Sequence, residues 1–438
     1  MTSRHKKCGL RLGLLLISSA VSGFAHNIEA PSLLNSLESY LQLAQSNNPQ
    51  LKAFEARYQA AIQRIPQAGS LPDPTLSVTH FVESIQTRTG PQENVFMLSQ
   101  RLPWLGKLKN RKAVASAEAE ALWFAYQTQQ LELAKQVSIL YYEFGYIGQS
   151  IRLTQQNLDL LHDFEPVVEE KVKTGSDLNA LLRLKVEIGK LEDKRLSLEQ
   201  DRLLQNLRIN ELLALPTATR LPSPLWDTPI PTVLDLQQLN QSISTHNPEL
   251  QMLKRKIASA DARRQIARLE SYPDITLGLN YIQTGSPSVN PTTPDAGNDP
   301  WSITITVNIP IWMNKTKSLR SEALSEKRAI ENEYDNRLNR LQADLSSSLA
   351  RLADAHRRLA LYRDELLGLA KQSVENSRSS YQSGRTGILE VIDSERSLLD
   401  LQLLSWRAAT DAWQQRILIQ TLANQSLSGT PTSIDEHE

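Results

Sequence analysis

The hydrophobic positions of the chain change their period at several points. In "WSITITVNI" (301–309) every second residue is apolar, and the residues between them are Ser, Thr or Asn. The stretches 74–82 and 274–282 alternate in the same way, and 94–102 does so faintly. Strict alternation predicts β-strands with one apolar and one polar face. We therefore expect four strands, at 74–82, 94–102, 274–282 and 301–309.

The segments after these strands have a helical composition. Leu, Ala, Glu, Gln, Arg and Lys dominate them, and Gly is rare. We expect long helices over 105–172, 177–213, 315–383 and 387–425, and a shorter helix before each pair of strands. Apolar residues of the second and fourth long helices step by three, four or seven, which is typical of helices packed side by side. A helix of nearly seventy residues would be on the order of 100 Å long, more than a compact domain needs.

Several segments of the first half recur in the same order in the second. Asn48-Pro49 corresponds to Asn247-Pro248, Pro103 corresponds to Pro310, and "VKTGSDLNALL" (172–182) corresponds to "YQSGRTGILEV" (381–391). Because these matches are collinear, we favour a duplication over chance similarity between helical sequences.

The repeats define the expected domains. The first repeat covers 26–214 and the second covers 233–426. The intervening segment 215–232 holds five prolines and is expected to be a linker. Residues 427–438 are polar and are expected to form a disordered tail.

Residues 1–25 have the layout of a secretory signal peptide. A basic start precedes an apolar run and small residues, and this segment also holds the one cysteine of the chain, Cys8. The alternative is an N-terminal anchor helix, although the apolar run is short for a membrane span. No later segment approaches 18 consecutive apolar residues, so we do not expect a helical membrane protein.

Charge and motifs exclude several function classes. The formal net charge is zero, which gives no reason to expect nucleic acid as a partner. The seven histidines are scattered and form no metal-binding motif. No nucleophile elbow, phosphate-binding loop or dinucleotide motif is present, so we expect no enzyme activity, no cofactor and no stable metal site.

The predicted strands suit a membrane better than a soluble sheet. Each half offers one hairpin, and no further apolar layer is available to cover its apolar face. Four strands are too few to close a barrel, and open sheet edges are not tolerated in lipid. We therefore expect several chains to share one barrel, with three chains giving twelve strands. The alternative is a soluble periplasmic coiled-coil scaffold that carries two hairpins.

Two segments carry a family resemblance. "QRLPWLGKLKNRKAVASAEAEA" (100–121) and "YQSGRTGILEVIDSERSLLDLQ" (381–402) resemble the TolC-type outer-membrane factors, and most of all the branch that serves heavy-metal efflux pumps of the resistance-nodulation-division (RND) class. The resemblance implies a mostly α fold with a small β part. It also implies a homotrimer with a 12-stranded outer-membrane β-barrel continued by an α-helical periplasmic tunnel.

The same resemblance implies a function. The chain would be a passive exit duct that works with a periplasmic adaptor (membrane fusion) protein and an inner-membrane RND pump, in the outer membrane of a Gram-negative-type cell. Heavy-metal cations are the expected cargo. Drugs, or proteins in type I secretion, are alternative cargoes for the same duct.

The resemblance also points to residues near the second helical turn. Glu390 and Asp393 match acidic residues that face the pore, where they would select cations; without the resemblance they read as ordinary solvated residues. Tyr381 and Arg385, with Asp177 on the first turn, match a gate only in part, because Arg385 and Asp177 are displaced from the family's positions.

Other candidate positions lie at the helical turns and at the strand-to-helix junctions. Gly175, Gly384 and Gly387 mark the turns, which we expect to contact the adaptor. The junctions carry two Pro-Trp combinations, Pro103 with Trp104 and Pro310 with Trp312. There the two tryptophans would lie near the membrane rim, with simple packing as the alternative.

Overall fold

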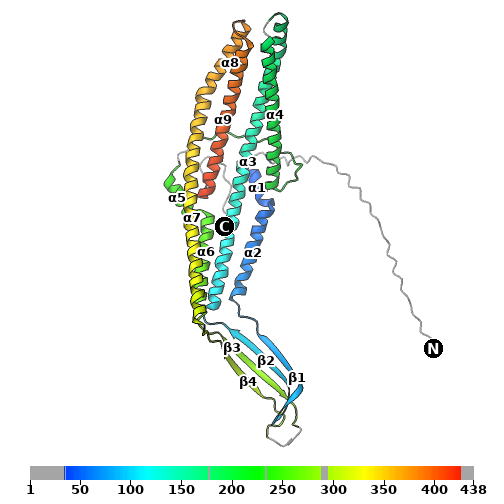
Figure 1. The fold of residues 1–438 in the computed structure, drawn as a ribbon, viewed down its shortest axis with the longest axis vertical. Helices are drawn as coiled ribbons and strands as arrows, with labels where there is room; N and C mark the ends of the chain where they lie inside the picture. Colours follow the sequence, from blue (N-terminus) through cyan, green and yellow to red (C-terminus); the bar gives the residue numbers. More distant parts are fainter. Residues whose placement is uncertain (1–33, 35, 176–177, 232–233, 288–293, 426–438) are drawn as a thin grey trace, which may run out of the picture.

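A computed structural model of the chain describes residues 34, 36–175, 178–231, 234–287 and 294–425. The structure is mostly helical, with one small sheet. In Figure 1 the long helices run side by side from this sheet to two helical turns at the opposite end. The predicted signal peptide (1–25) and disordered tail (427–438) lie outside the described residues.

The two halves follow the same order of elements. The first half contains α1 (Leu37–Asn47), α2 (Pro49–Gly69), β1 (Thr75–Thr87), β2 (Gly90–Leu102), α3 (Lys107–Lys173) and α4 (Leu178–Leu213). The second contains α5 (Leu236–His246), α6 (Pro248–Leu269), β3 (Ile275–Thr284), β4 (Trp301–Val307), α7 (Met313–Ala360), the π-helix η1 (Leu361–Leu366), α8 (Leu367–Gln382) and α9 (Ile388–Ala423). This shared order is consistent with the predicted duplication. The duplication and the repeat boundaries stay predictions.

Each half begins with two helices where the sequence analysis expected one. The break falls at Asn48-Pro49 and again at Asn247-Pro248. The side-chain oxygen of Asn48 accepts hydrogen bonds from two amides of the next turn, at 3.0 and 3.1 Å, and Asn247 caps α6 in the same way. Proline suits the first position of a helix because an N–H there would have no helical partner. Both breaks therefore follow from the same cap and proline.

The four strands form one antiparallel sheet in the order β1-β2-β3-β4, so β2 and β3 join the two halves. β1 and β2 are longer than expected and continue through most of residues 83–93, which separate the two predicted strands, turning at Arg88 and Thr89. The register of β1 shifts between His80 and Ile85. A shift of this kind interrupts the alternation, which is why the pattern in the sequence stops before the strand does.

The expected helix over 315–383 is not continuous. The π-helix η1 separates α7 from α8. The Pro-rich segment (215–232) contacts η1 here, since the Arg363 guanidinium donates to the Thr228 hydroxyl at 3.3 Å. A π-helix accommodates an extra residue in a helical turn, and residue pattern alone does not reveal it. By contrast α3 runs for 67 residues and passes through Pro166 without ending.

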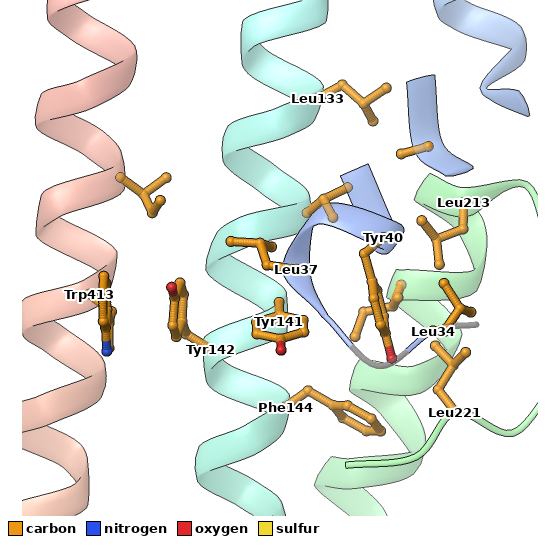
Figure 2. Close-up of a cluster of buried hydrophobic side chains, with 14 of the residues drawn as sticks. Leu34, Leu37, Tyr40, Leu133, Tyr141, Tyr142, Phe144, Leu213, Leu221 and Trp413 are labelled. Carbon is orange, nitrogen blue, oxygen red and sulfur yellow. The ribbon is translucent and has the colours of Figure 1, made fainter. Parts of the chain in front are cut away.

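An aromatic core holds the two halves together near the middle of the molecule. Figure 2 shows Tyr142 of α3 lying flat against Trp413 of α9, with ring centres 5.1 Å apart and planes 8° apart. Tyr40 of α1 packs edge-on against Tyr141 at 5.3 Å. This contact between α3 and α9 fixes the helices that lead to the two turns.

The Pro-rich segment lies against this core. Trp226 packs edge-on against Tyr142 and Trp406, with ring centres 5.6 and 5.2 Å apart. Gly145 of α3 permits the approach, because a Cβ atom there would clash with the indole nitrogen of Trp226. The segment therefore contacts both halves of the chain as it connects them.

Candidate functional site

One face of the sheet is apolar across all four strands. Residues that pair across neighbouring strands form rows that cross the sheet. One row consists of Leu76, Leu98, Leu279 and Ile303, and the next consists of Val78, Phe96, Tyr281 and Trp301. These side chains are exposed, for example Leu76 at 66% and Ile303 at 67%. The column from Trp301 to Val307 on β4 is roughly 20 Å long at the usual rise of a strand. That length is comparable with the apolar band of an outer-membrane barrel.

The opposite face of the sheet is mainly polar, although Val95, Met97 and Ile282 also lie on it. On β4 it presents Ser302, Thr304 and Thr306, and the Asn280 amide donates to the Thr304 hydroxyl at 2.7 Å. Exposed apolar and exposed polar faces on the same strands indicate two different surroundings, one apolar and one aqueous.

A polar row closes the apolar face at the end farther from the helices. His80 lies 2.8 Å from the Asn94 side-chain oxygen, and the Asn94 amide donates to Gln283 at 2.7 Å. The two outer edges of the sheet, along β1 and β4, pair with no further strand among the described residues. Unpaired edges of this kind are ready to pair with another chain.

Asp274 organises the junction between sheet and helices. Its carboxylate accepts hydrogen bonds from Arg101 at 2.7 Å, Lys107 at 2.9 Å and the Trp104 amide at 2.9 Å. Lys107 and Asp274 are both buried, at 1% and 5% exposed. The backbone amide of Asp274 also donates to the side chain of Asn308, the residue after β4. The carboxylate of Asp274 thus ties the crossing after β2 to the start of β3, and its backbone ties the crossing after β4 to the same point.

The charge state of Asp274 follows from these contacts. Burial alone raises the pKa of the carboxyl group, but the hydrogen bonds from Lys107, the Trp104 amide and Arg101 outweigh burial and lower the pKa to about 2. Asp274 is therefore ionised at neutral pH and balances the buried ammonium of Lys107.

The predicted junction residues differ in their surroundings. Trp104 stacks on Tyr272 with ring centres 5.2 Å apart, which is a packing role within the chain. Trp312 is 72% exposed and precedes the first residue of α7. Pro103 and Pro310 follow the ends of β2 and β4. Asp274 was not among the residues predicted from the sequence, although an acidic residue at the first position of a predicted strand, next to Pro273, was a visible signal.

The helical turns lie at the far end of the molecule from the sheet (Figure 1). Gly175 and Gly384 have φ of +100° and +70°, a region that favours glycine, and both follow the C-terminus of a long helix. Gly387 has φ of −82° and caps the start of α9. All three glycines are open to approach, since no other described atom lies within 4 Å of the point that a Cβ atom would occupy.

Glu390 and Asp393 are exposed in the first two turns of α9. Their spacing of three residues puts them on the same side of the helix. Glu395, two residues after Asp393 in α9, is 4% exposed and accepts a hydrogen bond from Arg378 of α8 at 2.8 Å. The sequence analysis missed Glu395, although a carboxylate at a position otherwise apolar, between Ile392 and Leu399, was a signal.

Of the three predicted gate residues, the structure describes two, Tyr381 and Arg385. Tyr381 is buried against Phe164, and the Lys171 ammonium lies 3.8 Å from the centre of its ring. Arg385 is exposed and donates to the Ser383 hydroxyl at 3.0 Å. Asp177 lies outside the described residues.

Two searches of the described residues gave negative results. No group of three or more His, Cys, Asp and Glu side chains there is arranged to hold a metal ion. None of the helices in the same part of the chain has a stretch long and apolar enough to cross a membrane.

Comparison with known proteins gives several relatives. The chain is 25% identical to the probable outer membrane lipoprotein SilC of Salmonella typhimurium over 70% of its own length and 66% of SilC. It is 23% identical to the cation efflux system protein CusC of Escherichia coli over 68% of its length and 65% of CusC. It is also 23% identical to the pyoverdine export outer membrane protein OpmQ of Pseudomonas putida, over 84% and 81%. The match thus spans slightly less than two thirds of SilC and of CusC.

The chain also resembles a solved structure and matches a protein family. The crystal structure of CusC superimposes with a TM-score of 0.75 at 17% identity, covering 90% of this chain and 93% of that one. This likeness confirms the predicted fold class. Residues 40–180 and 239–425 match the family described as outer membrane efflux protein. These two segments contain α3, α9 and the whole sheet, and so the chain belongs to the outer membrane efflux protein family.

Proposed function

We propose that the chain forms a passive exit duct through the outer membrane as a homotrimer. The observation that carries this proposal is the four-stranded sheet with an exposed apolar face, an exposed polar face and two unpaired edges. Pairing β4 of one copy with β1 of the next would remove every open edge, as lipid requires. Three copies of a four-stranded sheet would give a barrel of twelve strands. The polar face would line its water-filled interior.

The helices would continue the duct into the periplasm. Family membership identifies an efflux protein rather than an enzyme, so the energy for transport would come from a separate inner-membrane pump, which we propose is of the RND class. The turns at Gly175, Gly384 and Gly387 are exposed at the end remote from the sheet. We propose that a periplasmic adaptor protein contacts them there.

Metal cations are the cargo that we favour. Glu390 and Asp393 would form two stacked rings of carboxylates in a trimer, and such rings raise the local concentration of cations. The name of the relative CusC, cation efflux system protein, supports this cargo. The name of OpmQ, which refers to pyoverdine export, favours an organic cargo instead. A duct for drugs or for type I protein secretion is therefore the second candidate.

A deletion strain tests the function and its cargo. Survival of the strain should be measured across zinc, cobalt, cadmium, nickel, copper, silver and a panel of drugs. We expect the strain to be sensitive to one or more of the metals. The wild-type gene should restore resistance. Sensitivity to drugs alone would overturn the metal assignment. Recovery of the protein in the soluble periplasmic fraction, with no heat-resistant trimer, would favour a coiled-coil scaffold instead.

The carboxylates of Glu390 and Asp393 should determine ion selectivity. We expect the double substitution Glu390→Gln/Asp393→Asn to lower the ratio of cation to anion permeability by about tenfold at low salt. The effect should shrink in 1 M salt, where charges are screened within about 3 Å. Reversal potentials across planar bilayers in a salt gradient measure this ratio.

A control of equal charge change separates position from net charge. Asp163→Asn/Asp193→Asn removes two exposed carboxylates from α3 and α4. This variant should keep the wild-type selectivity. Equal loss of selectivity in both variants would contradict a specific role for Glu390 and Asp393.

We also propose the gate implied by the family resemblance, in which Tyr381 and Arg385 close the duct by bonding to Asp177 of a neighbouring turn. The exposure of Arg385 leaves its guanidinium available for such a contact. Arg385→Ala should raise the closed-state conductance severalfold in planar bilayers, whereas Arg396→Ala, which removes an exposed arginine of α9, should not. An unchanged closed-state conductance in Arg385→Ala would rule out the latch.

A further inference from the structure

A group of apolar side chains is exposed where the sheet meets the long helices. We call it the crossing patch, and its members are Leu105, Ile309, Ile311, Trp312 and Met313, exposed at 86%, 76%, 64%, 72% and 71%. The patch lies outside the strands, so the apolar face of the sheet does not by itself account for it. Ile309 continues the apolar column of β4, since it lies two residues beyond Val307 and the pairing of Asn308 with Asp274 keeps the alternation. At this point the patch is continuous with the apolar face.

At both crossings an exposed lysine follows an apolar patch residue, Leu105 or Ile311, by four positions in the sequence. Leu105 directly precedes the cap of α3, and Lys109 is the third residue of that helix. Ile311 directly precedes the cap of α7, and Lys315 is again the third residue. Both lysines are exposed, and neither makes an ion pair with another described residue. Lys317 adds a further exposed ammonium one turn below Met313.

Within the described residues, no ion pair involves Lys109, Lys315 or Lys317. The first turns of α3 and α7 contain no acidic residue. An apolar surface bordered by free ammonium groups is complementary to a phospholipid, whose acyl chains and phosphate lie in the same order. Long lysine side chains can reach a phosphate at the interface while their methylene groups stay in apolar surroundings.

A second copy of the chain does not account for both crossings. The edges available to another copy are β1 and β4. The crossing with Leu105 and Lys109 follows β2, which pairs with β1 on one side and β3 on the other. A neighbour bound at either edge is therefore separated from this crossing by a strand of the same chain. In the proposed position of the sheet, a lipid leaflet would surround the whole barrel and could reach every crossing.

We propose that each crossing binds a phospholipid of the leaflet nearer the helices. The acyl chains lie against the crossing patch, and Lys109 at one crossing, or Lys315 and Lys317 at the other, bind the phosphate. This inference rests on the proposed position of the sheet in the membrane. It adds a phosphate-binding site that favours anionic lipids and fixes the depth of the sheet.

The test compares two variants of the full-length protein in phosphatidylcholine vesicles. The first is Lys109→Glu/Lys315→Glu/Lys317→Glu. The matched control is Lys52→Glu/Lys256→Glu/Lys371→Glu, which reverses three exposed lysines on α2, α6 and α8. Spin-labelled phosphatidylglycerol and phosphatidylcholine report, through their immobilised fractions, which lipid binds the protein. The wild type and the control should prefer phosphatidylglycerol by roughly threefold, and the first variant should show no preference.

The outcomes separate this inference from the proposed function. Failure of the wild type to enter vesicles would refute the membrane position of the sheet itself. Insertion of all three proteins, with the same lipid preference, would refute only the phosphate site.

Discussion

Asp274→Ala is expected to destabilise the folded protein by about 3–5 kcal/mol, because it leaves the ammonium of Lys107 buried without its carboxylate. Lys107 is 1% exposed and lies 2.9 Å from Asp274. Glu270 at 3.4 Å is the remaining carboxylate near Lys107, and it is 38% exposed. The substitution also removes the acceptor of the Trp104 amide. The crossing after β2 would lose its anchor, whereas the bonds to Asn308 after β4 are made by the backbone of residue 274 and would remain.

The measurement is the temperature at which the folded oligomer dissociates in detergent, together with the amount of folded protein in the membrane. The matched variant Asp274→Leu/Lys107→Met removes both charges and should recover part of the loss, because no unpaired charge stays buried. Asp299→Ala, which removes a carboxylate bonded to Tyr281 at the opposite end of the sheet, should have a smaller effect. Equal stability of Asp274→Ala and the wild type would show that the junction does not depend on this ion pair.

The same carboxylate predicts a pH dependence. The pKa of Asp274 is about 2 in the folded protein and 3.8 as the ordinary value. A group with a lowered folded pKa stabilises the protein fully above its unfolded pKa, and this contribution is lost as pH falls toward the folded value. Stability of the wild type should therefore fall between about pH 4 and pH 2. Asp274→Leu/Lys107→Met should show a shallower fall over that range.

Ile303→Lys is expected to prevent most of the protein from assembling in the outer membrane. Ile303 lies in the middle of the apolar face and is 67% exposed in the single chain. A lysine facing the middle of the bilayer costs about 2–4 kcal/mol, and a homotrimer would carry that cost three times. The neighbouring residue Ser302 faces the polar side, so Ser302→Lys changes the charge equally but meets water.

The readout is the heat-resistant oligomer recovered from outer-membrane fractions. Ser302→Lys should yield nearly as much as the wild type, and Ile303→Lys should yield little. Equal yields of the two variants would contradict the assignment of the apolar face to lipid. Loss of both variants would indicate that β4 tolerates no lysine. The comparison would then move to β3, where Leu279 lies in the same row as Ile303 and Asn280 lies on the polar side. Leu279→Lys should then yield little oligomer and Asn280→Lys nearly as much as the wild type.

The sequence predicted the elements of this fold better than their joints. Alternation in 301–309 and the proline-poor runs after the strands indicated strands and long helices directly, because period and composition are local properties. The Asn-Pro pairs at 48 and 247 held the information for the helix breaks, yet they were used only as marks of duplication. The π-helix η1 left no comparable sign, because composition and apolar period do not change at 361–366.

The candidate site shows the same limit. Asp274 acquires its role from Arg101, Lys107 and Asn308, which come from distant parts of the chain and meet only after the sheet has formed. Likewise Tyr381 matches a gate by position and stays a prediction, and in the single chain the ammonium of Lys171 lies over its ring. Whether such a residue faces a pore depends on neighbouring copies, which a single sequence does not specify.

The conductance of the purified full-length protein in planar lipid bilayers tests the central claim most directly. An exit duct made by several copies predicts discrete conductance steps with a preference for cations, in a preparation that contains the heat-resistant oligomer. Folded oligomer that enters the bilayer and yields no steps, even in Arg385→Ala, would contradict the account.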